Sequence, residues 1–298
     1  MTASTMQLTT RLRTWALVAG LTGLLIAFGA LLGGSWLWLF VFLAVAMNAV
    51  GYFRSDTIAL RAARAKPLEE ADAPQLHAIA RDLAAAAKIP APRLYVMPGE
   101  QCNAFATGRD PGHAAVAVTE GLLTRMEPDH VRAVMAHEFA HIRNRDILVS
   151  SIAAMVAGAI SAATAILQLS FLFGGSEDDE SPLGTLGAIA AMILAPIGAV
   201  LLQLGVSRQR EYLADATAAE MLGDGRPLAE ALQAIAGDDE AGPLDVPAAT
   251  APMYILNPLR GEQVAKLFST HPPVRDRIRR LRAYGDTARR QRTRAVTA

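Results

Sequence analysis

The chain has 298 residues, of which 52% are hydrophobic, and its formal net charge is zero. This length fits one or two domains, and the neutral charge balance gives no indication of nucleic-acid binding. The lone cysteine, Cys102, excludes an internal disulfide and fits a reducing compartment, where it is either a small buried filler or a reactive thiol.

Two uncharged apolar segments near the start, residues 14–33 and 35–53, are each long enough to cross a bilayer. Only glycines separate them, so they predict a tight transmembrane hairpin within residues 1–56. The first segment ends in small residues and would also fit a cleaved signal peptide. The second span directly after it favours an uncleaved anchor.

Residues 57–146 predict the first part of a water-exposed domain. Within it, residues 73–88 have the apolar spacing of a helix that ends before Pro90. Three short stretches with strand character follow, separated by turn sequences: RLYVM, NAFAT and AAVAVT. Strands this close in the chain predict a small antiparallel or mixed sheet.

The next predicted helix carries a metal-binding pattern, HEFAH. It opens at Pro128, because proline costs least in the first turn of a helix. Helix positions four apart differ by about 40° in direction, so His137 and His141 can hold one ion with two imidazole nitrogens. Glu138, about 100° away, suits a base that takes a proton from water beside the ion. The alternative is two surface histidines on an ordinary helix.

A second apolar region, residues 147–206, contains two more uncharged stretches and predicts a second transmembrane hairpin. Pro196 should kink its second helix. The high alanine and glycine content leaves a buried or half-inserted hairpin open. We expect the helix of His141 to run on continuously to Ile147, which would place the metal site at the membrane surface.

Lysine and arginine residues flank only one side of the two hairpins, and the short loops on the other side contain neither. The positive-inside rule therefore predicts a multi-pass protein of the cell inner membrane. Both termini, residues 54–146 and residues 207–298 should be cytoplasmic.

A catalytic zinc site usually needs a third protein ligand and keeps one position open. Glu211 is the best candidate, because it lies on a predicted helix that starts just past the second hairpin. This helix is expected to end at Gly223 or Gly225. Asp215, one turn later, can accept the free N–H of a zinc-binding histidine and fix its tautomer. Asp146 could do the same work or could cap the charged helix end.

The remainder of residues 207–298 holds an acidic loop, residues 237–250, and a helix that restarts after Pro272. Many arginines between Arg275 and Arg294 would attract anionic lipid headgroups, but a solvated tail is an equal alternative. Three other histidines lack ligand spacing and are expected to be surface groups: His77, His113 and His130.

Four motifs, NAFATG, HEFAH, SRQREYLAD and LFSTHPPVRDRI, together resemble the HtpX-type membrane zinc metalloproteases, relatives of the CAAX prenyl proteases. The resemblance covers most of the chain and implies an α+β fold, mainly α, in which a cytoplasmic gluzincin-type peptidase domain with a small β-sheet joins transmembrane helices. It also implies cleavage of membrane or misfolded proteins at the cytoplasmic face, as in protein quality control under stress.

Site roles follow from the resemblance. His137, His141 and Glu211 would bind one Zn²⁺ per subunit, and Glu138 would be the general base.

Asn103 and Ala104 would lie on an edge strand that holds the substrate backbone by strand addition, although NAFA could be only a core strand. His271 would lie near the scissile carbonyl and support the developing oxyanion, or could merely introduce the following helix. Arg277 would lie near the glutamate ligand. No oligomeric state is predicted.

The rival class is a non-catalytic membrane scaffold or transporter that uses zinc only structurally. A structural site would use four closed ligands, usually including cysteines, whereas Cys102 is the sole cysteine. The apolar spans also lack internal charge, which argues against a transporter.

Overall fold

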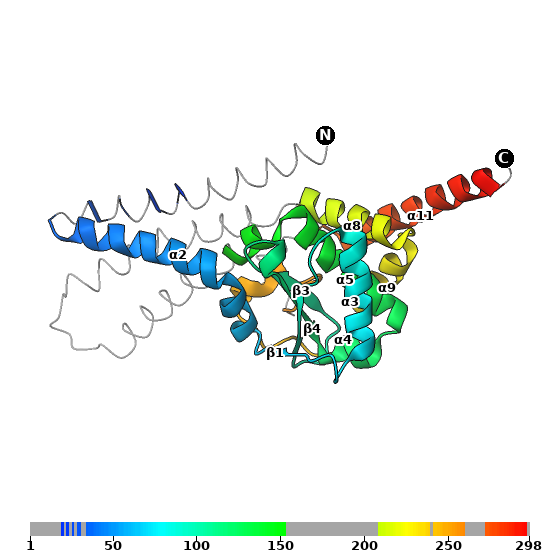
Figure 1. The fold of residues 1–298 in the computed structure, drawn as a ribbon, viewed down its shortest axis with the longest axis horizontal. Helices are drawn as coiled ribbons and strands as arrows, with labels where there is room; N and C mark the ends of the chain where they lie inside the picture. The colour runs from blue at the N-terminus through cyan, green and yellow to red at the C-terminus, as the bar shows by residue number, and fades with distance from the viewer. Residues whose placement is uncertain are drawn as a thin grey trace, which may run out of the picture.

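The structure is a computed structural model (Figure 1). It describes residues 19–20, 22–23, 26, 29–30, 34–152, 208–238, 241–259 and 272–296. Most of the first predicted span, most of the second predicted hairpin and His271 lie outside the described residues.

The described chain is a mainly helical α+β structure with one small sheet. Its elements are α2 (Trp36–Ala62), β1 (Lys66–Pro67), α3 (Pro74–Ala87), β2 (Arg93–Met97), β3 (Ala104–Thr107), η1 (Pro111–His113), β4 (Ala115–Thr119), α4 (Glu120–Arg125), α5 (Pro128–Asn144), α8 (Arg208–Leu222), α9 (Arg226–Ala236), η2 (Ala248–Met253) and α11 (Val274–Val296). The predicted strands and the helices α3, α5, α8 and α11 are confirmed, whereas β1, α4 and α9 were not predicted.

The sheet is mixed, with the strand order β1-β2-β4-β3. β2 and β4 are parallel, and both outer strands pair antiparallel with their neighbours, so β3 forms one edge. Both faces of β3 and β4 are buried. One face packs into the main core with α5, and the other faces the end of α2. A strand buried on both sides needs small or apolar residues, which explains the sequences AFAT and AVAVT.

α5 is the central helix of the domain and packs against α3, α8, α9 and β3. Pro128 occupies its first turn and Asp129 follows, where a negative charge complements the helix dipole. Because neighbours cover most sides of α5, its buried residues include the polar pair His137 and Glu138. The packing therefore encloses the HEFAH motif.

The expected continuous helix from His141 to Ile147 is wrong. α5 ends at Asn144, and Arg145 adopts a left-handed conformation with φ 62°. The Asp146 N–H then donates to the His141 carbonyl at 2.9 Å, which closes the helix end before a new helical turn begins at Ile147. This break brings the Asp146 carboxylate beside the His141 ring.

Among the described residues, one helix is long and apolar enough to cross a bilayer by length and composition, Leu37–Ala62 within α2. Its first part exposes large apolar side chains such as Trp38 (73%) and Phe42 (70%). Its last turns bury Ala59 and Leu60 against the sheet. α2 thus projects from one end of the domain, while α11 projects from the other (Figure 1).

Candidate metal centre

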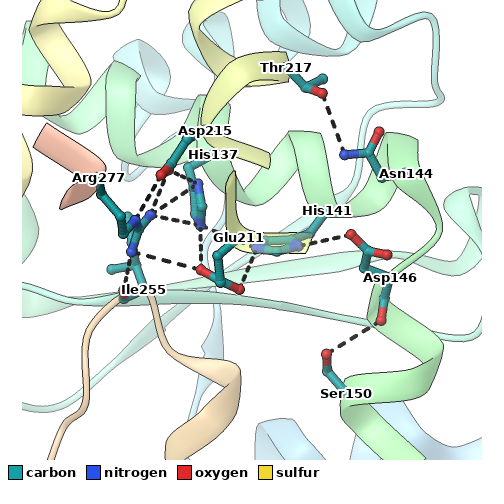
Figure 2. A network of polar contacts seen from close by, with 10 residues as sticks. All are labelled: His137, His141, Asn144, Asp146, Ser150, Glu211, Asp215, Thr217, Ile255 and Arg277. Carbon is teal, nitrogen blue, oxygen red and sulfur yellow. Dashed lines mark hydrogen bonds and ion pairs between the residues drawn. The ribbon is translucent and has the colours of Figure 1, made fainter. Parts of the chain in front are cut away.

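Three side chains from two helices converge on one point (Figure 2). His137 and His141 lie one turn apart on α5, and Glu211 lies in the first turn of α8. The two Nε2 atoms are 3.2 Å apart, and each lies 3.5–3.6 Å from an oxygen of Glu211. One ligand atom from each residue fits within 4.8 Å of the others, so the three residues could hold a metal ion.

A carboxylate lies behind each imidazole and orients it. Asp215 Oδ1 is 3.0 Å from His137 Nδ1, and Asp146 Oδ2 is 3.3 Å from His141 Nδ1. When the Nδ1–H of a neutral imidazole donates to such a carboxylate, the lone pair is on Nε2, the atom that lies 3.5–3.6 Å from Glu211. Both rings are therefore held in the tautomer that a metal requires.

Arg277, which comes from α11 and is fully buried, joins the site to the C-terminal part of the chain. Its Nε and Nη2 atoms donate to the two oxygens of Asp215 at 2.9 and 2.7 Å. Its Nη1 atom lies 3.8 Å from Glu211 and donates to the Ile255 carbonyl at 3.0 Å. A bidentate pair of this kind fixes the position of Asp215, and through it the ring of His137.

The charges around the two histidines favour a bound cation. Arg277 contacts two of the buried carboxylates in this region, Asp215 and Glu211, and so is outnumbered by them. The buried carboxylates are Glu138, Asp146, Glu211 and Asp215. Buried charges are costly unless they are paired or bind a metal. An excess of carboxylates over guanidinium therefore fits a site built for a divalent ion.

Ionisation at the site follows from burial and these pairs. Burial acts to raise the pKa of Asp215, but Arg277 and His137 outweigh it and lower that pKa to about 2. Burial and Arg277 act to lower the pKa of His137, whereas hydrogen bonds with Asp215 and Glu211 outweigh them and raise it to about 9. A proton and a metal therefore compete for the same imidazole.

Glu138 lies beside this group and does not join it. Its side chain is buried, and burial raises the pKa of its carboxyl. Its Oε1 has no hydrogen-bond partner among the residues that the structure describes. Glu138 lines a cavity of about 20 Å³ together with both histidines and Glu211, which is room for about one water.

The other predicted site residues have different surroundings. The Asn103 side chain and the Ala104 carbonyl bond to residues 255 and 256 of the same chain. His271 lies outside the described residues. His77, His113 and His130 contact Leu68, Asp110 and Glu230, away from the three candidate ligands.

Cavity-lining residues that sequence reasoning missed are Ser150 and residues 252–255. Ser150 lies one turn into the helix that follows the break at Arg145. The stretch from Pro252 to Ile255 has neither periodicity nor chemically distinctive side chains, so no local pattern could have identified it. Only the folded arrangement brings these residues to the site.

Comparison with known proteins gives a consistent set of relatives. The profile of peptidase family M48 matches residues 70–285. A Protease HtpX homolog of Syntrophobacter fumaroxidans is 50% identical over 278 residues, which cover 92% of this chain and 99% of that protein. One from Thermococcus sibiricus is 48% identical over 277 residues, which cover 91% and 94%.

A crystal structure of S. mikatae Ste24p has a similar fold. It matches with a TM-score of 0.51 and 20% identity, over 93% of this chain and 67% of that one. At this identity the likeness concerns the fold alone.

We expect Asp146→Asn to weaken the affinity for a divalent ion, with Zn²⁺ as the probe, by about 10–100-fold, because His141 loses the carboxylate that holds its tautomer. Competition with a chromophoric chelator on the purified protein measures this affinity. Asp146 is a better test than Asp215, whose loss would also leave Arg277 without its bidentate partner. Asp82→Asn, at an exposed surface pair, is the matched control. An unchanged affinity in Asp146→Asn would mean that this carboxylate does not orient the ligand.

Proposed function

This chain belongs to peptidase family M48 and is a metalloendopeptidase, and we propose that it binds zinc and cleaves membrane or misfolded proteins at the cytoplasmic face of the inner membrane. One observation carries the proposal: two imidazoles and a carboxylate converge beside a buried glutamate oxygen that has no hydrogen-bond partner among the described residues. Family membership decides against the non-catalytic scaffold or transporter.

We assign His137, His141 and Glu211 as the zinc ligands. Two neutral imidazoles and one carboxylate suit zinc, and a three-residue set leaves a coordination position for water, as in other catalytic sites. When bound, the ion would supply Lewis acidity that polarises a peptide carbonyl and lowers the pKa of water. Asp215, positioned by Arg277, and Asp146 would keep both rings aimed at it.

Glu138 is the proposed general base. Its buried carboxylate would take a proton from the attacking water while the water oxygen forms a bond to the carbonyl carbon. The same carboxyl group would then give this proton to the amine nitrogen as the C–N bond breaks. Burial raises the pKa of Glu138, which brings the base closer to the working pH.

Substrate handling is assigned to the edge of the sheet. Asn103 and Ala104 would bind the backbone of an extended substrate next to β3, and His271 would support the oxyanion. An extended backbone is available in misfolded proteins and in segments that emerge from the membrane, but not in a folded domain. This requirement supports the proposed substrate class.

The domain organisation that we propose alternates membrane and peptidase segments. Residues 1–56 and 147–206 would form two membrane hairpins, and residues 57–146 and 207–298 would form one peptidase domain. The packing of α5 against α8 supports the second part, because these helices come from the two separate stretches. The exposed apolar side chains of α2 support the first part.

We expect Glu138→Gln to retain zinc but to cleave an unfolded protein such as casein about 10²–10⁴-fold more slowly, because the amide cannot accept the proton. Metal analysis and a casein assay on the same preparation measure both quantities. Glu120→Gln, on the exposed face of α4, is the control. Full activity in Glu138→Gln would reject the assignment of the base.

Cysteine labelling tests the orientation. In a Cys102→Ala background, Ser35→Cys should react with an impermeant maleimide from outside intact spheroplasts, because Ser35 lies in a loop without lysine or arginine. Thr124→Cys, exposed on α4, should react only after lysis. The reverse pattern would place the peptidase domain outside the cell.

A further inference from the structure

The outer edge of β3 is already occupied by a piece of the same chain, Tyr254–Leu256. Phe105 and Tyr254 form an antiparallel bridge, and the Ile255 N–H donates to the Ala104 carbonyl at 3.1 Å. The Asn103 amide nitrogen donates to the Leu256 carbonyl at 2.9 Å, and its oxygen lies 3.5 Å from the Leu256 N–H. This short segment is thus bound as an additional strand.

Arg277 also holds the segment. The Ile255 carbonyl accepts from Arg277 Nη1 at 3.0 Å, so both backbone groups of Ile255 are bonded. The side chains of Tyr254 and Ile255 are almost fully buried, on opposite sides of the sheet. Such a segment does not leave its place without breaking these bonds.

The segment also borders the candidate metal centre. Residues 252–255 line the same cavity as His137, Glu138, His141 and Glu211. The cavity volume of about 20 Å³ holds about one water. The segment and a substrate strand would need the same edge of β3, so with the segment in place this edge is closed to a substrate backbone.

We propose that Tyr254–Leu256 is an internal strap that occupies the substrate-binding edge and must leave β3 before a protein can be cleaved. This inference rests on the proposed function, which assigns Asn103 and Ala104 to the substrate backbone. A substrate strand would need the same acceptor at Ala104 and the same amide at Asn103, so strap and substrate exclude each other. Because the strap belongs to the same chain as β3, it competes for this edge at an effective concentration on the order of millimolar. Only an extended substrate that is present locally at high concentration would therefore displace it.

The sequence around the strap keeps its pairing short. Pro252 precedes it and Pro258 follows it, and neither residue has an N–H to donate. The 3₁₀ helix η2 ends at Met253, directly before the strap, so the chain is not extended there, and the hydrogen bonds and bridge to residues 103–105 involve only these three residues in the described part of the chain. A short pairing is reversible, which a strap that opens for each substrate requires.

A reversible disulfide tests the strap. In a Cys102→Ala background, Phe105→Cys and Tyr254→Cys would face each other across the antiparallel bridge, where Cα atoms lie about 4.5–5.5 Å apart, within reach of a disulfide. We expect the oxidised, zinc-loaded protein to cleave casein at least about tenfold more slowly than the same protein after reduction, with equal zinc content in both states.

Two outcomes overturn the proposal in distinguishable ways. Equal cleavage rates before and after reduction, with the cross-link verified by mass spectrometry, would show that the strap need not move. A zinc-loaded Cys102→Ala parent that cleaves nothing would overturn the proposed function, and the strap with it.

A measurement on the unaltered chain is independent of how the cysteine variant folds. Amide hydrogen exchange is followed on the zinc-loaded protein with and without an extended peptidyl hydroxamate. We expect the Ile255 amide to exchange at least about tenfold faster with the hydroxamate bound, while the β4 amides keep their protection. An Ile255 amide that stays protected beside the bound hydroxamate would contradict the strap.

Discussion

The packing of α5 against α8 is the contact on which the rest of this structure depends. α5 carries the two histidines and α8 carries Glu211, and the second apolar region separates these helices in the sequence. Fully buried alanines on both helices, among them Ala140 and Ala214, allow a close approach. Any loss of this contact would separate the glutamate from the imidazoles.

Burying this many ionisable groups would destabilise the fold unless each had a partner. Arg277, on the C-terminal helix α11, is the partner of Asp215 and lies near Glu211. The break at Arg145 brings Asp146 beside His141, so these two groups are partners as well. Four segments therefore contribute to the metal centre: α5, the break that follows it, α8 and α11. A shift of any one of them would change the geometry of the site.

Much of this arrangement could be predicted from sequence, and the exceptions have physical reasons. Apolar periodicity and proline positions identified α3 and α5. The four-residue spacing predicted His137 and His141 as a ligand pair, and the position of Glu211 just past the second apolar region predicted it as the third ligand. The prediction of a continuous helix past His141 was wrong, because the left-handed backbone conformation of Arg145 has no sequence signature. The pairing of residues 254–256 with β3 was equally hidden, since a partner so far along the chain is chosen by tertiary packing.

The chemistry proposed for this peptidase depends on one ion held jointly by α5 and α8. Diffraction from crystals of the zinc-loaded protein, with anomalous scattering measured at the zinc edge, tests this most directly. We predict one zinc peak about 2.0–2.2 Å from Nε2 of His137, Nε2 of His141 and an oxygen of Glu211. A zinc peak elsewhere, or a Glu211 carboxylate turned away from both imidazoles, would contradict it.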